Sequence, residues 1–125
     1  MESFPDIHDY PAIVECIELR EKLITEKDPE TIKYICKTLI DMIPDVKTQQ
    51  KEYNAKYKMA FPSADEFDFV TVEPFKRLAI MYEKEGELQI AMLFCDYALS
   101  LGYNDDGTKG GMKGRLNKLR KKAGY

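Results

Sequence analysis

Histidine and cysteine, which supply most zinc ligands and many catalytic nucleophiles, are scarce in this sequence of 125 residues. The single histidine, His8, has Asp6 and Asp9 close beside it. These three residues could hold a metal ion only weakly, and local capping in front of Pro11 is the favoured interpretation. We therefore expect neither a metal nor another cofactor.

The three cysteines lie far apart and show no C-x-x-C spacing; they are Cys16, Cys36 and Cys95. Each falls among apolar residues at helical spacing, which is typical of reduced thiols in a hydrophobic core. An intermolecular disulfide or a reactive thiol is the alternative. Reduced core cysteines are characteristic of cytoplasmic proteins, because disulfides form mainly in oxidising compartments.

Long apolar segments are also missing. The longest uninterrupted apolar run is IAMLFC at residues 90–95, far short of the roughly 20 residues that span a bilayer. The N-terminal stretch MESFPDIHDY is acidic and contains no apolar signal segment. We expect a cytoplasmic protein without membrane association, and the Lys- and Glu-rich composition suggests a bacterial or phage origin.

Basic charge is concentrated at the C-terminal end of the chain. Residues 107–125 contain seven basic side chains and no acidic one, whereas the other 106 residues carry 12 basic and 22 acidic side chains, a net charge of −10. The seven are Lys109, Lys113, Arg115, Lys118, Arg120, Lys121 and Lys122. An acidic body with a basic end bears on the choice of partners rather than on the fold.

The apolar residues recur at helical spacing along almost the whole chain, which predicts an all-α fold of five to six helices in a single domain. The only candidate strand is DFVTV at residues 68–72. We expect a first helical hairpin at 11–44, a helix and an aromatic, acidic loop at 45–71, a second hairpin at 72–103, and a basic C-terminal capping helix at 109–123.

Two local signals define the second helix of the first hairpin. Asp28 is a suitable cap, Pro29 presets the first-turn dihedral angle, and Glu30 favours the positive end of the helix dipole. Pro44 is expected to end the helix. In the loop FPSADEFDFV at 61–70, the phenylalanines either pack between the hairpins or dock a partner.

Residues 72–105, and especially the stretch 75–103, resemble a tetratricopeptide repeat, a helix–turn–helix unit with small and aromatic residues at fixed spacing. The matching residues are Phe75, Leu78, Ala79, Tyr82, Gly86, Ala91 and Ala98. Cys95 replaces the family's usual aromatic residue, and Tyr103 replaces its closing proline. The first hairpin matches poorly, because Arg20 occupies a small-residue position and Lys27 stands where the turn glycine belongs.

Tetratricopeptide repeats bind peptides or protein segments in a groove lined by the first helix of each repeat. The resemblance implies groove residues Glu73, Lys76, Ile80, Glu83 and Lys84. In the weaker hairpin the corresponding residues are Val14, Ile17, Glu21 and Ile24. Ordinary surface exposure or packing between helices is the alternative for both sets.

The glycine-rich segment NDDGTKGGMKGR at 104–115 fits none of the common loop motifs that it partly resembles. A calcium loop placed on Gly107 would run from Gly102 to Lys113 and lack carboxylates at both ends. A phosphate-binding P-loop needs Gly-Lys-Ser or Gly-Lys-Thr, which is absent. GMKG matches the G-x-x-G of KH domains, but that motif requires a sheet.

Two interpretations of this segment remain, and they are compatible. The first is a turn that leads into the capping helix. The second is an anion site in which free backbone N–H groups of Gly110 and Gly111 lie among basic side chains. The candidate anion-site residues are Lys109, Gly110, Gly111, Lys113 and Arg115.

No arrangement of residues indicates catalysis, so we do not expect an enzyme. The leading expectation is a small helical adaptor that binds a protein or peptide, with a basic or mixed-charge segment against its acidic body. A first alternative is nucleic-acid binding through the basic helix from Lys113 to Lys122. A second is an acidic inhibitor of the phage or mobile-element type that mimics nucleic acid.

Overall fold

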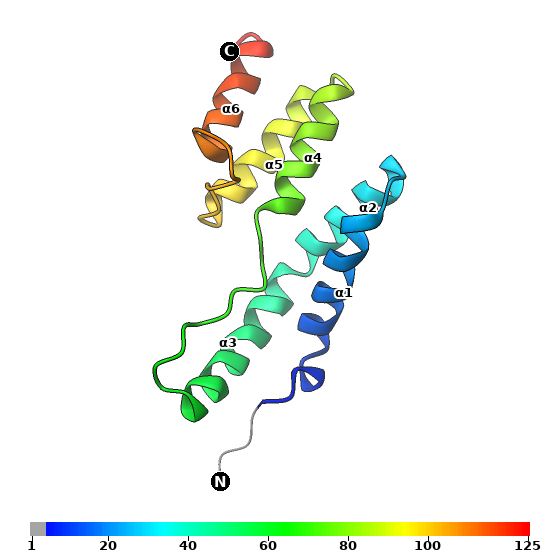
Figure 1. Cartoon of the computed structure of the whole chain (residues 1–125). Helices are drawn as coiled ribbons and strands as arrows, with labels where there is room; N and C mark the ends of the chain where they lie inside the picture. Colours follow the sequence, from blue (N-terminus) through cyan, green and yellow to red (C-terminus); the bar gives the residue numbers. More distant parts are fainter. Residues whose placement is uncertain (1–4) are drawn as a thin grey trace. The chain divides into compact units, whose positions relative to one another are not determined.

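The structure, a computed structural model, describes residues 5–125 and contains only helices and connecting loops in that range (Figure 1). The predicted all-α fold is confirmed, and residues 68–72 form no strand. The elements are η1 (Ile7–Asp9), α1 (Pro11–Thr25), α2 (Pro29–Asp41), α3 (Ile43–Ala60), α4 (Glu73–Lys84), α5 (Leu88–Ser100) and α6 (Gly111–Lys122). None of these helices is long and apolar enough to cross a membrane.

The chain separates into two compact units, and each is described by itself. Unit 1 is Met1–Val70 and unit 2 is Thr71–Tyr125. The division falls where the repeat-like hairpin of the sequence begins.

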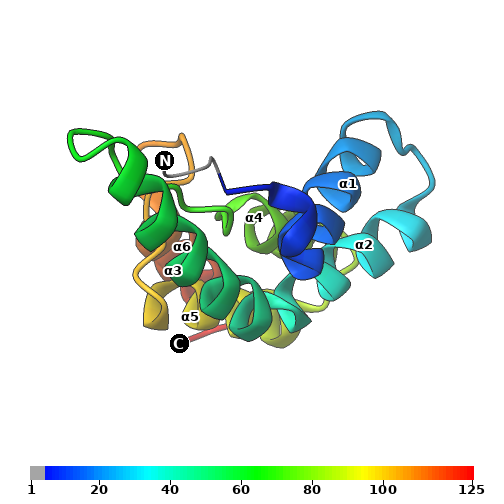
Figure 2. The ribbon, with the colours of Figure 1, turned by 90° about the horizontal axis from the view of Figure 1, so that it is seen from below.

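In unit 1, α1 packs against both α2 and α3, which follow one another after a short break at Met42 (Figure 2). Asp28 caps α2 as predicted, because its Oδ2 accepts a hydrogen bond from the Thr31 backbone N–H at 3.0 Å. Hydrogen bonds from Thr31 hold the pKa of Asp28 below its usual value. Apolar side chains of the three helices form the core: Ile13, Cys16, Leu23, Ile32, Ile35, Cys36, Leu39, Ile40, Ile43 and Val46.

The prediction that the helix beginning at Pro29 ends at Pro44 is wrong. α2 ends at Asp41, and Pro44 lies in the first turn of α3. Proline lacks an N–H group, and the first turn of a helix is the place where that N–H would have no helical partner. Pro44 therefore begins a helix instead of ending one.

The loop at residues 61–72 is held to α3 by a side-chain amide. Asn54 is buried, and its Nδ2 donates to the Phe67 carbonyl oxygen while its Oδ1 accepts from the Phe67 N–H, both at 2.8 Å. Tyr53 lies among the surrounding rings, with centroids 5.5 Å from Tyr10 and 5.9 Å from Phe69. The side chains of Phe61 and Phe67 in this loop remain partly exposed.

Unit 2 begins with the α4–α5 hairpin, whose turn is made by Gly86 in the left-handed region at φ +78°. Three small residues that allow close approach of the helices are fully buried: Ala79, Ala91 and Ala98. Phe75 is buried between the helices, and the Tyr82 ring stacks on Phe94 with centroids 5.9 Å apart. The six helical positions of the repeat-like motif thus face the hairpin core.

The last helix, α6, packs on α5 through its apolar face. Met112, Leu116 and Leu119 are buried, as the predicted capping role requires, while all four lysines of the helix are exposed. The Lys76 side chain near the start of α4 reaches Asp106 just before α6, and Glu83 near the end of α4 pairs with Lys122 at the end of α6. α4 and α6 therefore run in the same direction.

Candidate functional site

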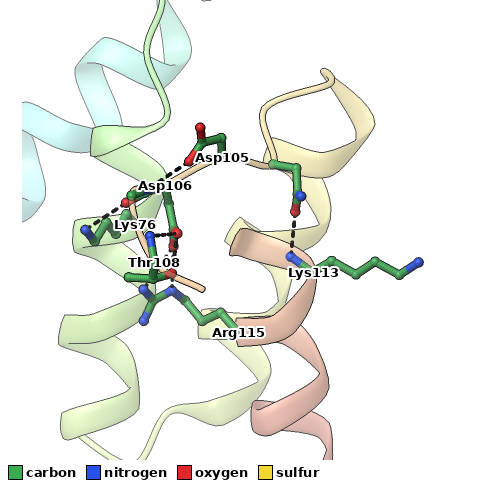
Figure 3. Close-up of polar contacts among 8 residues, drawn as sticks. Lys76, Asp105, Asp106, Thr108, Lys113 and Arg115 are labelled. Carbon is green, nitrogen blue, oxygen red and sulfur yellow. Dashed lines mark hydrogen bonds and ion pairs between the residues drawn. The ribbon is translucent and has the colours of Figure 1, made fainter. Parts of the chain in front are cut away.

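The loop between α5 and α6, residues 101–110, is built around the carboxylate of Asp106, whose side chain is 0% exposed. Its Oδ1 accepts hydrogen bonds from the Thr108 backbone N–H at 3.0 Å and from the Thr108 hydroxyl. Its Oδ2 accepts from Arg115 Nε at 3.2 Å and from Arg115 Nη2 at 3.0 Å (Figure 3). Four donors thus surround one buried carboxylate.

This carboxylate is ionised at neutral pH. Burial by itself would raise the pKa of Asp106, but the hydrogen bonds from Thr108 and Arg115 together outweigh burial and lower it. Arg115 is only 16% exposed at its side chain, so each partner neutralises a charge that would be costly to bury alone. The pair fixes the first turns of α6 to the loop.

Asn104 caps the start of α6 with both of its oxygens. Its backbone oxygen accepts from the Met112 N–H at 2.8 Å, and its Oδ1 accepts from the Lys113 N–H at 2.9 Å. The Gly111 N–H donates to the Thr108 carbonyl at 3.1 Å. The expectation of a free N–H group at Gly111 is therefore wrong, because this N–H already has an acceptor within the loop.

Glycine is required at position 111. Its φ is +61°, and a Cβ atom there would lie 2.4 Å from the Asn104 backbone oxygen. The close approach of Asn104 to the helix start thus depends on the missing side chain.

Two contacts connect this loop and α6 to α4. Lys76 Nζ donates to the backbone oxygen of Asp106 at 2.9 Å, and Lys122 Nζ lies 3.6 Å from Glu83 Oε2. The first contact holds the loop to the beginning of α4, and the second joins the two helix ends. Between them α4, the loop and α6 enclose a small polar depression.

We call this depression the α4–α6 pocket. Its volume is about 210 Å³, and it is lined by Glu83, Thr108, Lys109, Gly111, Arg115 and Lys118. The charge of Arg115 is neutralised by Asp106, and Glu83 is paired with Lys122. Lys109 and Lys118 are exposed, and no ion pair joins either of them to another side chain within residues 5–125. The pocket is therefore positively charged and can accept a carboxylate or a phosphate.

The predicted groove residues all lie on α4 but differ in their surroundings. Glu83 lines the pocket, and Lys76 holds the Asp106 loop instead of facing an open groove. Ile80 is half-buried, while Glu73 and Lys84 are exposed. The set predicted on the first hairpin lies on α1 in unit 1, with Val14 and Ile17 half-buried and Glu21 and Ile24 exposed.

Three of the five predicted anion-site residues line the α4–α6 pocket: Lys109, Gly111 and Arg115. Gly110 is the N-cap of α6 with φ +86°. The Lys113 side chain points away from the Asp106–Arg115 pair in Figure 3. The structure thus brings together Glu83 from the predicted groove and three residues of the predicted anion site.

Sequence reasoning missed the residues that shape the pocket, namely Asn104, Asp106 and Thr108. A local signal was present for Asp106, because Asp side chains in turns often accept from the backbone N–H two residues further on, as Asp106 does from Thr108. Asn104 gave no such signal, since its Oδ1 accepts from the Lys113 N–H nine residues later. Such a signal locates a turn. It does not show that Arg115 supplies the counter-charge nine residues later.

The acidic residues near His8 and the three cysteines were the other candidates for chemistry, and their contacts are those of structural residues. Asp6 accepts from the His8 N–H at 3.0 Å and so caps η1, as the favoured interpretation held. Within the described residues, no group of three or more His, Cys, Asp or Glu side chains is placed to hold a metal ion. All three cysteines are buried and free, and burial raises the pKa of Cys95 to about 11, which keeps this thiol protonated at neutral pH.

No family model, curated protein or solved structure matches this chain. The all-α fold rests on the structure. The likeness of residues 72–105 to a tetratricopeptide repeat rests on the motif residues and on their positions in the α4–α5 hairpin.

Proposed function

We propose that this chain is a small protein–protein interaction module without catalytic activity, and that its α4–α6 pocket receives an acidic segment of a partner protein. The observation that carries the proposal is the pairing inside the pocket. Arg115 and Glu83 have counter-charges of their own, whereas Lys109 and Lys118 line the same depression without one among the described residues. A partner carboxylate would supply the missing charge.

The distribution of charge between the units supports an acidic partner at unit 2. Residues 1–70 contain 9 basic and 15 acidic side chains, a net charge of −6, while residues 71–125 contain 10 basic and 7 acidic ones, a net charge of +3. An acidic segment is therefore attracted to unit 2 over a longer range than the pocket itself. The sequence alone suggested a basic partner on the acidic body, and the pocket changes that preference.

The order and direction of the helices in unit 2 agree with the resemblance to tetratricopeptide repeats, and this agreement supports the proposal. α4 and α5 correspond to the two helices of a tetratricopeptide repeat, and α6 runs in the direction of α4, as the first helix of a following repeat would. First helices line the peptide groove in that family. The α4–α6 pocket lies between the two helices that would occupy those positions.

Nucleic-acid binding is the second candidate, and one observation favours it. The side chains of Lys113, Lys118, Arg120 and Lys121 are exposed on α6, and that helix contains no acidic residue. Such a face can contact phosphates without reading sequence. This mode would use the whole helix face, whereas the acidic segment uses the pocket.

A peptide selection separates the two candidates. The full chain is used to select from a displayed library of random dodecamers, and enriched peptides are then measured by fluorescence anisotropy. We expect enrichment of Asp and Glu, and a loss of affinity of at least tenfold in the variant K109E/K118E. The matched control K113E/K121E makes the same change of charge on residues that do not line the pocket.

The same two variants are titrated with a labelled single-stranded oligonucleotide and with its duplex. Equal loss of peptide affinity in both variants would contradict the pocket. Oligonucleotide binding that falls equally in both variants and weakens steeply with salt, without enrichment of acidic peptides, would support the basic helix instead.

A further inference from the structure

α5 carries an apolar row on its exposed side. Ile90, Leu93 and Tyr97 occur at i, i+3 and i+7 and are 36%, 66% and 41% exposed. The opposite side of the helix is buried against α4 and α6. The Tyr97 ring also contacts Phe75 of α4, with centroids 5.5 Å apart, and Leu93 is the most exposed residue of the row. A contiguous exposed apolar row is typical of a surface that another molecule covers.

A groove lies beside this row, between α5 and α6. Its volume is about 320 Å³, and it is lined by Gln89, Met92, Leu93, Asp96, Leu116, Arg120 and Tyr125. Gln89 Nε2 donates to the Tyr125 hydroxyl oxygen at 3.1 Å, which holds this exposed aromatic ring at the edge of the groove. We call the row and the groove together the α5–α6 face.

The α5–α6 face carries one acidic and one basic side chain. Asp96 and Arg120 are its only charged lining residues, both are exposed, and no ion pair joins either side chain to another within the described part of the chain. A two-fold axis brings unlike residues of two identical faces together. Asp96 of one copy would then meet Arg120 of the other, twice in each pair of molecules.

We propose that two copies of this chain associate through the α5–α6 face about a two-fold axis. Their four helices pack as a bundle with Leu93 near the axis and the two reciprocal Asp96–Arg120 pairs at the rim. α5 has 13 residues and is therefore about 20 Å long, so two adjacent helices present on the order of 400 Å² per copy. An interface of this size is weak, and we expect dissociation in the micromolar range.

This association is independent of the α4–α6 pocket. The two sites use different residues of α6, since Arg115 and Lys118 line the pocket whereas Leu116 and Arg120 line the groove. A dimer formed in this way would present two pockets to its partners, so the avidity for a partner with two acidic segments would rise.

Charge reversal tests the proposal with full-length protein. Sedimentation equilibrium from about 1 to 300 µM is expected to show a concentration-dependent dimer. D96R places arginine opposite Arg120 of the other copy, and R120D places aspartate opposite Asp96, so each variant alone is expected to dissociate at least tenfold more easily. An equimolar mixture of D96R and R120D restores both unlike pairs and is expected to dimerise again.

The mixture separates a broken interface from a misfolded protein, because misfolded chains would not recover on mixing. E87R and K121D are matched controls, with the same changes of charge on α5-side and α6 residues that do not line the groove. Monomers of the unaltered chain at every concentration would overturn the proposal. So would a mixture of D96R and R120D that stays monomeric, or controls that dissociate as easily as the test variants.

Discussion

Each of the two units fixes a loop with one buried polar side chain, but the two side chains differ in charge. In unit 1, Asn54 makes two hydrogen bonds of 2.8 Å with the backbone of Phe67. In unit 2, Asp106 accepts from Thr108 and Arg115 and receives Lys76 at its backbone oxygen. The first is a neutral clamp and the second is ionic.

The difference shows what a buried charge adds to a loop. A buried neutral amide requires hydrogen-bond partners, which Phe67 supplies to Asn54, but it requires no counter-charge. A buried carboxylate requires a cation, so Asp106 determines where the Arg115 side chain lies. Because Arg115 is neutralised in this way, the lysines that share its pocket, Lys109 and Lys118, are the ones left for a partner.

The largest effect is expected from D106A. This change leaves Arg115 with a poorly exposed and unpaired charge and removes the acceptor of Thr108, so unit 2 should lose about 3 to 5 kcal/mol of stability. Urea unfolding followed by circular dichroism measures the loss, and hydrogen exchange with mass spectrometry locates it in residues 71–125.

The neighbouring variant D105A is the control for this prediction. Asp105 is exposed, and within residues 5–125 its side chain accepts only from the Gly107 N–H at 3.0 Å, so its loss should cost less than about 1 kcal/mol. Equal destabilisation by D105A and D106A would show that the charge of the loop matters and the buried ion pair does not.

A smaller effect, about 2 kcal/mol, is expected from N54A in unit 1. The substitution leaves the N–H and the carbonyl of Phe67 without their partner in a partly buried position. The rate of amide hydrogen exchange should rise in residues 61–70 and remain unchanged in α4–α6. E52A, which removes an exposed ion-pair partner of Lys56 from the same helix, is the control and should change stability by less than about 0.5 kcal/mol.

The stability contributed by the ionic clamp at Asp106 should depend on pH, whereas the stability contributed by the neutral clamp at Asn54 should not. The folded-state pKa of Asp106 is lowered, so its contribution is fully present above the unfolded-state value, near 3.9, and is lost as the pH falls below that value through the folded pKa. We expect the urea midpoint to fall more between about pH 6 and about pH 3 in the unaltered chain than in D106N. Identical pH dependence in the two proteins would refute an ionised Asp106.

The smallest effect is expected at the start of α6. N104A removes the side-chain oxygen that accepts from the Lys113 N–H but keeps the backbone oxygen that accepts from Met112. Loss of a helix cap of this kind costs about 1 kcal/mol. A thermal melt followed by circular dichroism should show a small decrease in midpoint, and N104D, which keeps an acceptor, should restore most of it.

The sequence was sufficient for most of the fold because the helices are specified locally. The apolar spacing of α2, its Asp28 cap and the small residues of the α4–α5 hairpin are all readable within a short window. Pro44 was misread because proline is compatible both with the end of one helix and with the first turn of the next.

The candidate site was harder to predict because its contacts are not local. Lys76 meets Asp106 across 30 positions of the chain, and a helical pattern gives no sign of such a contact. Lys109 and Arg115 were recognisable from the excess of basic residues. That Arg115 is already neutralised, and that Gly111 donates to Thr108, follows only from the folded loop.

An NMR titration of the full-length chain with an acetylated hexaglutamate peptide tests the central claim most directly. The account predicts amide shift changes centred on Lys109 and Lys118 and on the pocket residues between them in space, with little change at Lys113 and Lys121. Changes spread evenly along α6, or their absence at Lys109 and Lys118 when the peptide is in excess, would contradict it.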